Sequence, residues 1–194
     1  IMTKPESINV VLASSSPNRE ALLRRLGLPF KVCHPCVDET RRPSESVKNT
    51  VTRLSKEKAL AIRAKSNEIV IGSDQLGEFN GLPVGKPLTR EKNITQLLDF
   101  SGRTVCFYTG LFIIRFHDQE IRQSIVTSTL KFRSLTRAEV EFYVDSEMAL
   151  NAAGGFKIEG LGISLIEKFS SDDPTAIIGL PLMLTSRFLR ELGG

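Results

Sequence analysis

Glu68-Ile-Val-Ile-Gly-Ser-Asp-Gln75 is the stretch that decides the fold, because a run of β-branched residues leads into a glycine and then a carboxylate. Such an apolar run, bounded by turn residues, predicts a strand covered on both faces, as in an α/β sheet. Asp74 is predicted just past the C-terminal end of this strand, where ligands bind in open α/β sheets. A carboxylate there can hold a metal or activate a water. The alternative is that Asp74 only turns or caps the chain.

Residues 8–13 predict a second buried strand, which leads through a serine-rich turn into a helix. Ser16 is the expected N-cap, Pro17 suits the first helical position, and the apolar stripe of the helix ends at Gly27. Free backbone N–H groups, serine hydroxyls and the positive end of the helix dipole, together with Arg19, form a phosphate cradle. The local alternative is a well-capped helix with a solvated arginine.

Residues 29–37 predict a further strand, which delivers Asp38 and Glu39 at its end. Because adjacent strand residues point to opposite faces, one of these two carboxylates is expected to face any given site. Residues 45–64 then predict a helix with apolar residues at helical spacing, and Lys58 lies along it. Lysines on helices are usually solvated, so spacing alone does not assign Lys58 to a site.

Residues 76–84 contain Asn80-Gly81, the strongest short signal for a β-hairpin. Gly85-Lys-Pro87 follows directly. A glycine permits close backbone approach and a proline fixes the exit of the chain, so Lys86 is held in a defined place that suits a phosphate. A solvated loop lysine is the alternative at this position.

The remaining segments complete an α/β pattern around a long antiparallel hairpin, formed by residues 103–116 and 120–132. Ala153-Gly-Gly-Phe-Lys-Ile-Glu-Gly160 is glycine-rich and polar, which is typical of a loop that lets a ligand come close. The other predicted elements are a helix from Thr89 to about Gly102, a helix from the capping box Thr136-Arg-Ala-Glu139 to about Asp145, a strand over 162–169 and a final helix from Pro181. We therefore predict one α/β domain spanning residues 1–194, with two lobes around a cleft.

The composition is that of an ordinary globular protein, with 41% hydrophobic and 25% charged residues in 194. A net charge of +4 suits anionic substrates but falls short of the clustered basic face of a nucleic-acid binder, so no stable nucleic-acid partner is expected. The apolar runs are far shorter than the roughly 20 residues that span a bilayer. We expect a cytoplasmic protein with no membrane partner.

Cys33-His-Pro-Cys36 has the spacing of a C-x-x-C redox motif. That motif works because a following helix N-terminus lowers the thiol pKa, and here an acidic segment with a proline follows instead. Zinc would need a second ligand pair at metal-site spacing, which Cys106 and the two histidines do not supply. Neither a redox nor a zinc role is predicted for Cys33 and Cys36.

Six motifs, in this order, together resemble the Maf family of nucleoside triphosphate pyrophosphatases: Leu12-Ala-Ser-Ser-Ser-Pro-Asn-Arg19, Val37-Asp-Glu39, Glu57-Lys-Ala59, Gly72-Ser-Asp-Gln75, Gly85-Lys-Pro87 and Phe156-Lys-Ile-Glu-Gly160. The resemblance implies an elongated mixed β-sheet flanked by helices and related to inosine triphosphate pyrophosphatases. It also implies a central cleft, a divalent cation (Mg²⁺ or Mn²⁺), a nucleoside triphosphate substrate and a homodimer. The Ser-Asp-Gln and Phe-Lys-x-Glu-Gly forms resemble the YceF-type branch, which hydrolyses 7-methylguanosine triphosphate (7-methyl-GTP).

The same resemblance implies roles for individual residues. It makes Asp74 the proton acceptor that activates water, and it places the metal on Glu39 and Asp74. Lys58 and Lys86 are implied to assist catalysis. The residues implied to bind phosphates are Ser14, Ser16, Arg19, Lys58 and Lys86, and those implied to choose the base are Asn18, Gln75 and Glu159.

These roles agree with the chemistry of the reaction. Attack of water at the α-phosphorus, with pyrophosphate leaving, needs mainly a placed water and neutralised charge. A carboxylate such as Glu159 accepts the N–H donors of a guanine edge and favours a cationic methylated base. Asn18, however, stands where that branch carries a tryptophan, which could stack on the base. Two alternatives therefore stay open: a dTTP/UTP or broad-specificity pyrophosphatase, and a nucleotide-binding regulatory protein without turnover.

Overall fold

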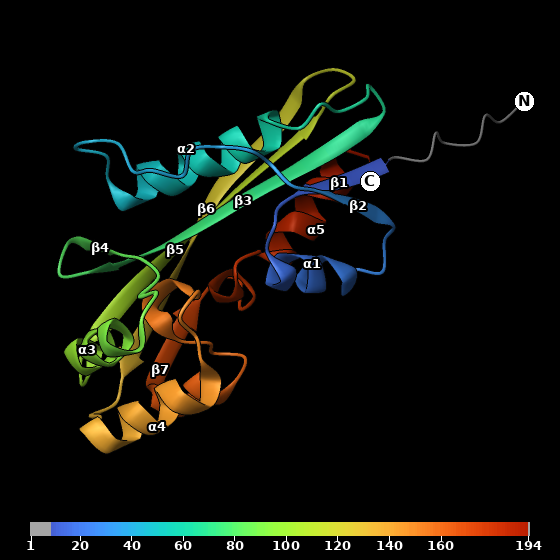
Figure 1. The fold of residues 1–194 in the computed structure, drawn as a ribbon. Helices are drawn as coiled ribbons and strands as arrows, with labels where there is room; N and C mark the ends of the chain where they lie inside the picture. Colours follow the sequence, from blue (N-terminus) through green and yellow to red (C-terminus); the bar gives the residue numbers. More distant parts are fainter. Residues whose placement is uncertain (1–8, 194) are drawn as a thin grey trace, which may run out of the picture.

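A single mixed β-sheet runs through the molecule in the computed structural model, which describes residues 9–193 (Figure 1). Its strand order is β2-β1-β3-β5-β6-β7, and β4 pairs with β3 outside this path. The strands are β1 (Asn9–Ala13), β2 (Phe30–Cys33), β3 (Glu68–Phe79), β4 (Leu82–Val84), β5 (Thr104–Arg115), β6 (Glu120–Phe132) and β7 (Ile166–Ser171). β1 is parallel to both β2 and β3, whereas β3, β5, β6 and β7 are successively antiparallel.

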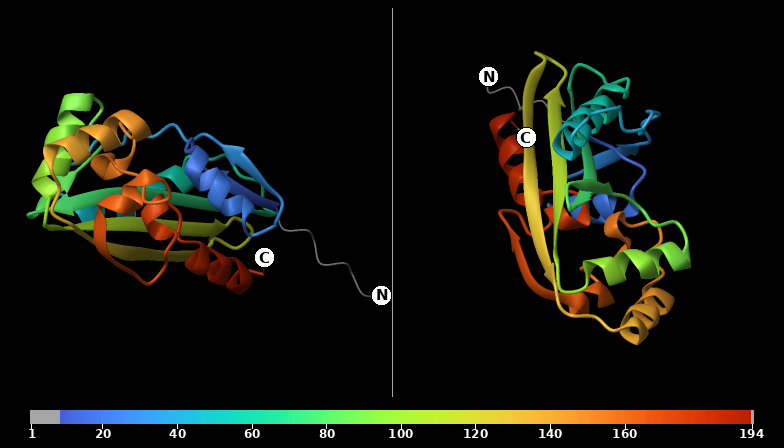
Figure 2. Two further views of the ribbon diagram at one scale, coloured as in Figure 1. Left: turned by 90° about the horizontal axis from the view of Figure 1, so that it is seen from below. Right: turned by 90° about the vertical axis from the view of Figure 1, so that its left-hand side faces the viewer.

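Helices cover both faces of the β1-β3-β5 region. The α-helices are α1 (Pro17–Arg24), α2 (Val47–Leu60), α3 (Arg90–Phe100), α4 (Arg137–Glu147) and α5 (Leu182–Glu191), and the 3₁₀ segments are η1 (Ala153–Gly155), η2 (Leu161–Leu165) and η3 (Ala176–Ile178). α2 and α5 lie on opposite sides of the sheet (Figure 2). α1 and α5 share one apolar cluster with β1, β3 and β5, so they cover the face opposite α2.

A second lobe surrounds the far ends of β5 and β6, where α3 and α4 lie side by side (Figure 1). Its core is aromatic: Phe100 and Phe107 are buried, and the Phe132 ring lies 5.5 Å from that of Phe156. The predicted fold class is confirmed, because a mixed sheet flanked by helices joins two lobes around a cleft. Within residues 9–193, no helix combines the length and apolar character needed to cross a membrane.

Local capping and turn signals are confirmed. Ser16, Thr89 and Thr136 cap α1, α3 and α4 through their side chains, and Thr136 forms the predicted capping box with Glu139. The hairpins over 103–132 and at Asn80-Gly81 are present. Both residues of the latter turn have positive φ, 51° and 76°, which is why asparagine and glycine suit it. Ile8, the expected first residue of β1, lies outside the described residues.

The predicted end of the strand at Asp74 was wrong. β3 continues to Phe79 because it pairs with β5 from Ile69 to Glu78, with Asp74 opposite Gly110, and with β4 from Gly77 to Phe79. The strand predicted over 29–37 is also shorter, since β2 ends at Cys33, level with the end of its partner β1. Asp38 and Glu39 therefore lie in an irregular segment and not at a strand terminus.

Two other boundaries differ from those predicted. The helix expected over 45–64 is α2, Val47–Leu60, with Ser46 as its N-cap. The strand expected over 162–169 begins four residues later and runs to Ser171, because residues 161–165 form η2. A Cβ on Gly162 would lie 2.4 Å from the carbonyl oxygen of Lys157, so the chain is folded back on itself here and cannot be extended.

Candidate active site

The site lies at a gap in strand pairing along one edge of β3. β1 pairs with β3 as far as Gly72, and β4 pairs with it from Gly77 onward. Residues 73–76 are thus flanked on that edge by neither strand, and a cleft of about 920 Å³ opens beside them. Asp74 lines this cleft from the middle of the strand. This gap in pairing exposes a polar side chain at an edge of the sheet, as the end of a strand does in an open α/β sheet.

Alternation along β3 splits the motif Gly72-Ser-Asp-Gln75 between the two faces of the sheet. Gly72 and Asp74 face α2, whereas the Ser73 and Gln75 side chains bond to backbone on the other face. The four residues therefore serve two different sides of the site.

Two glycines let α2 approach the sheet closely. A Cβ on Gly72 would lie 2.1 Å from the Ser55 carbonyl oxygen, and one on Gly110 would lie 2.5 Å from that of Val51. This approach brings Lys58 of α2 to Asp74 of β3, with Nζ 2.6 Å from Oδ1. Both side chains are buried, so Lys58 is not one of the solvated lysines that are usual on helices.

Lys58 also binds Glu39, with Nζ 2.8 Å from Oε1, so its ammonium lies between two carboxylates. Partial burial of Glu39 raises its pKa, but the hydrogen bond from Lys58 and the charges of Lys58, Lys86 and Arg19 outweigh burial and lower it. Asp38 turns away and accepts from the backbone N–H of Thr40 at 2.9 Å. Of the two acidic residues only Glu39 lines the cleft, as expected, but strand alternation is not the reason because both lie outside β2.

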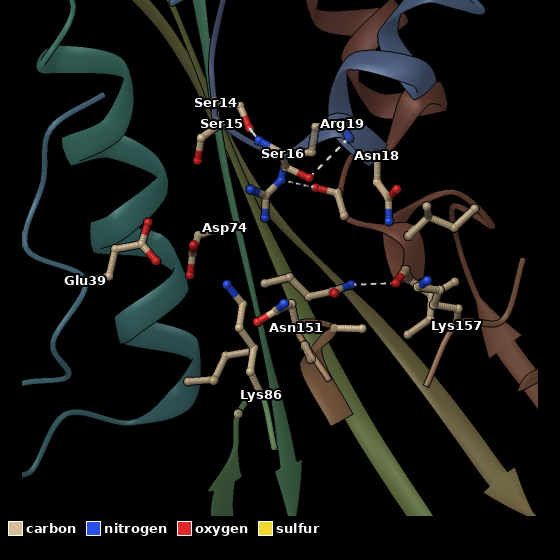
Figure 3. Close-up of a pocket in the computed structure, with 18 of the residues that line it drawn as sticks. Ser14, Ser15, Ser16, Asn18, Arg19, Glu39, Asp74, Lys86, Asn151 and Lys157 are labelled. Atoms are coloured by element: carbon tan, nitrogen blue, oxygen red, sulfur yellow. Dashed lines mark hydrogen bonds between the residues drawn. The ribbon is translucent and has the colours of Figure 1, made fainter. Parts of the chain in front are cut away.

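The serine turn and α1 present Arg19 to the same carboxylates (Figure 3). Ser14 Oγ accepts from the Ser16 N–H at 3.0 Å, and Ser16 Oγ accepts from the Arg19 N–H at 3.4 Å. Each hydroxyl keeps its own proton for donation to an anion. Arg19 Nε donates to the Gly179 carbonyl at 2.8 Å. Burial lowers the pKa of the Arg19 guanidinium, and the nearby Asp74 and Glu39 carboxylates oppose that shift.

Lys86 enters the cleft from the loop that follows β4 (Figure 3). This loop is joined to the segment after α4 by two backbone hydrogen bonds, from the Leu88 N–H to the Leu150 carbonyl and from the Gly154 N–H to the Gly85 carbonyl, each 3.1 Å long. The exposed Lys86 ammonium is therefore carried by a loop that is fixed on both sides.

Gln75 makes hydrogen bonds within the protein that the sequence did not suggest. Its Nε2 donates to the carbonyls of Ala176 and Ile177 at 2.9 and 2.8 Å, and it lies 3.2 Å from Thr109 Oγ1. The amide hydrogens are thus used to hold η3. The amide oxygen of Gln75 is the atom that remains for a ligand.

Asn18 and Glu159 meet across the cleft, with Asn18 Nδ2 3.3 Å from Glu159 Oε1. Asn18 lies on α1, and Glu159 belongs to the predicted glycine-rich loop. The structure brings every predicted site residue to this one cleft: Ser14, Ser16, Asn18, Arg19, Glu39, Lys58, Asp74, Gln75, Lys86 and Glu159.

Five polar residues of the cleft were not singled out by the sequence analysis: Ser15, Arg41, Thr50, Asn151 and Lys157. Ser15 and Lys157 lie inside quoted motifs, so their position next to candidate residues was an available signal. Arg41 Nη1 donates to the Glu45 carbonyl at 2.6 Å, which holds another cation near Glu39. Asn151 had no comparable sequence signal.

Neither Cys33 nor Cys36 lines the cleft. Cys33 is half-buried, Cys36 is exposed, and both are free thiols. Across residues 9–193, no three histidine, cysteine, aspartate or glutamate side chains gather into a group that could hold a metal. A cation here would depend on ligands from its substrate as well as on the two carboxylates beside Lys58.

Fold and site together define an α/β protein with a polar cleft in which the buried Asp74 and the exposed Glu39 converge with several cations. Residues 9–192 match the family model described as "Maf-like protein", and the chain belongs to this family. The family prediction made from the six motifs is confirmed.

Relatives with curated names align with this chain over nearly its full length. A Nitrosococcus oceani protein named 7-methyl-GTP pyrophosphatase is 42% identical over 99% of this chain and 97% of its own length. A Polaromonas protein with the same name is 43% identical, over 97% of this chain and 87% of its own. A Pseudomonas aeruginosa protein of that name is 42% identical, over 95% and 97%. Among solved structures, the Staphylococcus aureus Ham1 protein matches 64% of this chain and 71% of its own at 21% identity, with a TM-score of 0.45.

Proposed function

We propose that the protein is a nucleoside triphosphate pyrophosphatase that hydrolyses 7-methyl-GTP to the monophosphate and pyrophosphate with the help of a divalent metal. The observation that carries the proposal is the buried Lys58 between Asp74 and Glu39, in a cleft that Arg19 and Lys86 also line. The names of the relatives support the reaction and the base.

Asp74 is the proposed base. Lys58 binds Oδ1, and we assign the water to Oδ2. As the water oxygen bonds to the α-phosphorus, its proton passes to Asp74. The bond from the α-phosphorus to the bridging oxygen breaks, and the electron pair leaves with pyrophosphate. Arg19, Lys58 and Lys86 offset the charge of the phosphates during this displacement.

The residues present fit a hard divalent cation such as Mg²⁺ or Mn²⁺. Glu39 and Asp74 direct oxygens at one point that an ammonium now holds, and Mg²⁺ is commonly bound by one or two carboxylates together with substrate phosphates. When bound, the metal would polarise phosphate oxygens and neutralise charge. Glu39 and Asp74 are its proposed ligands.

Base choice is assigned to the far side of the cleft. Glu159 accepts one hydrogen bond from Asn18 and keeps capacity for the N–H donors of a guanine edge. Its charge also favours a base made cationic by methylation. Asn18 binds Glu159, so in this chain the residue that stands where the YceF-type branch carries a tryptophan acts on the carboxylate and not by stacking.

A nucleotide panel tests the proposal. Pyrophosphate release is measured with Mg²⁺ or Mn²⁺ from 7-methyl-GTP, GTP, dTTP and UTP, for the wild type and for Asp74→Asn. The matched control is Asp145→Asn, which removes an exposed carboxylate of α4 that pairs with Arg90.

We expect 7-methyl-GTP to be preferred, Asp74→Asn to lose about 10²- to 10⁴-fold in kcat while nucleotide binding persists, and Asp145→Asn to match the wild type. Indifference to the methyl group, or preference for dTTP and UTP, refutes the assigned base. Absence of release from every nucleotide refutes the enzyme and favours a binding-only protein.

A further inference from the structure

Glu159 lies in a tight turn whose ends are both fixed. The Gly160 N–H donates to the Lys157 carbonyl at 3.2 Å, which closes the turn around Glu159. A Cβ on Gly162 would lie 2.4 Å from that same carbonyl oxygen, so the returning chain packs directly on the turn. The Glu159 carboxylate projects into the cleft from this closed unit.

Two side chains of α4 hold the ends of the turn. The Lys157 N–H donates to the Tyr143 hydroxyl oxygen at 2.9 Å, and the Leu161 N–H donates to Glu147 Oε2 at 2.7 Å. Tyr143 and Glu147 are four residues apart, so they lie on one face of α4. The two bonds bracket Glu159, one at the start of its turn and one just past the end.

The two side chains that hold this turn, Tyr143 and Glu147, each have close neighbours. Tyr143 is fully buried, and burial raises the pKa of its phenol, so the oxygen that accepts belongs to the neutral hydroxyl. The Glu147 carboxylate lies against Gly160, where a Cβ would come within 2.5 Å of Oε2. Lys157 Nζ lies 3.9 Å from Glu147 Oε1 and adds an ion pair.

We propose that Tyr143 and Glu147 are positioning residues that set base selectivity by holding Glu159 at the cleft, an inference that rests on the function proposed above. Neither residue lines the cleft, so they act through the turn. Most of the phosphate side of the site comes from α1, α2 and β3, whereas this support comes from α4. Lys86 comes from the loop after β4, whose backbone bonds go to Leu150 and Gly154 and not to the turn that carries Glu159. Loosening the turn should therefore affect recognition of the base and spare the reacting phosphates.

The physical reason is the steep geometry of hydrogen bonding. A base-edge contact weakens sharply when donor and acceptor move apart or tilt. A carboxylate on a mobile turn must also be ordered when the base binds, which reduces affinity. The loss should appear chiefly in KM for 7-methyl-GTP, with kcat largely kept.

The experiment compares Tyr143→Phe and Glu147→Ala with the control Glu141→Ala, which removes another glutamate of α4 whose partner is the exposed Arg137. Glu147→Gln keeps an acceptor oxygen for the Leu161 N–H and is the conservative variant that should rescue the loss, and Tyr143→Phe carries the test if Glu147→Ala folds poorly. The readout is the ratio of kcat/KM for 7-methyl-GTP to kcat/KM for UTP, with pyrophosphate release measured for both. We expect the ratio to fall about tenfold for Tyr143→Phe and Glu147→Ala. Glu147→Gln and Glu141→Ala should stay close to the wild type.

A double-mutant cycle completes the test. If Glu147 acts through Glu159, adding Glu147→Ala to Glu159→Ala should leave the ratio unchanged. An equal fall for both nucleotides, or a full further fall in the Glu159→Ala background, overturns the inference while pyrophosphate release still supports the proposed reaction. Loss of release from the wild type itself is the separate result that refutes the function.

Discussion

Gly72→Ala is expected to disable the site by moving a helix, without touching a catalytic group. The added methyl group would lie 2.1 Å from the Ser55 carbonyl oxygen and 2.9 Å from the Ala59 backbone nitrogen, both on α2. Ordinary contact begins at 3.4 Å, so the methyl falls 1.3 Å short (3.4 Å less 2.1 Å). Both obstacles are backbone atoms that cannot rotate away, and the helix must shift.

The consequences follow from what α2 carries. Lys58 lies one turn along from Ser55, with its Nζ 2.6 Å from Asp74, so a shift of about 1 Å breaks or lengthens this contact. Overpacking of this kind costs about 1–3 kcal/mol of stability. A misplacement of about 1 Å in an active site can cost on the order of 10²-fold in rate. We expect both losses together, with the loss of rate in kcat.

Urea unfolding and steady-state pyrophosphate release measure the two effects. Gly77→Ala is the matched control, because it adds the same methyl group to the same strand, with its closest neighbours on β5 and β4, Phe107 at 3.0 Å and Val84 at 3.1 Å. It should lose some stability and keep kcat. A Gly72→Ala protein with wild-type kcat would refute the argument that this glycine sets the Lys58–Asp74 distance.

Three further substitutions test individual charges. Arg53 donates to Glu45 and lowers the pKa of Glu45 from 4.5 to about 2. The contribution of this ion pair to folding stability is therefore complete above pH 4.5 and is lost as the pH falls towards 2. The free energies of urea unfolding of the wild type and Glu45→Gln should converge over that range. Arg19→Lys keeps the charge but loses the Nε–H donor to Gly179, and steady-state kinetics should show KM raised about tenfold with little change in kcat. Glu39→Gln removes a proposed metal ligand, and titration with Mg²⁺ should show half-saturation at about tenfold higher concentration.

Sequence reasoning succeeded where the signal is local. Caps such as Ser16 and the turn at Asn80-Gly81 depend on hydrogen bonds or dihedral angles within a few residues, and both are present. The true length of β3 was missed because it is fixed by pairing with β5, whose partner residues lie 36 (Asp74 to Gly110) to 28 (Glu78 to Cys106) residues further along the chain. The end of β2 was missed for the same reason, since its partner β1 ends beside it.

The candidate site follows the same division. Its residue types were predictable because each chemical role needs a carboxylate, a cation or an amide, and the predicted residues do line one cleft. The contacts among these residues were not predictable, because Gln75 holds η3 a hundred residues away and Asn18 binds Glu159 at a separation of 141 residues. Only tertiary packing determines which of a side chain's hydrogen bonds remain for a ligand.

The gap in pairing along β3 explains how one short motif can serve two tasks. Because β1 stops at Gly72 and β4 starts at Gly77, the exposed edge is long enough for residues on both faces of the strand to line the cleft. Asp74 faces α2 and its lysine, while Gln75 faces η3. A one-residue slip of β3 against β5 would exchange these faces and put the carboxylate beside the carbonyls of η3. The register of the central strands therefore fixes which side chains of this motif meet Lys58 and which meet the carbonyls of η3.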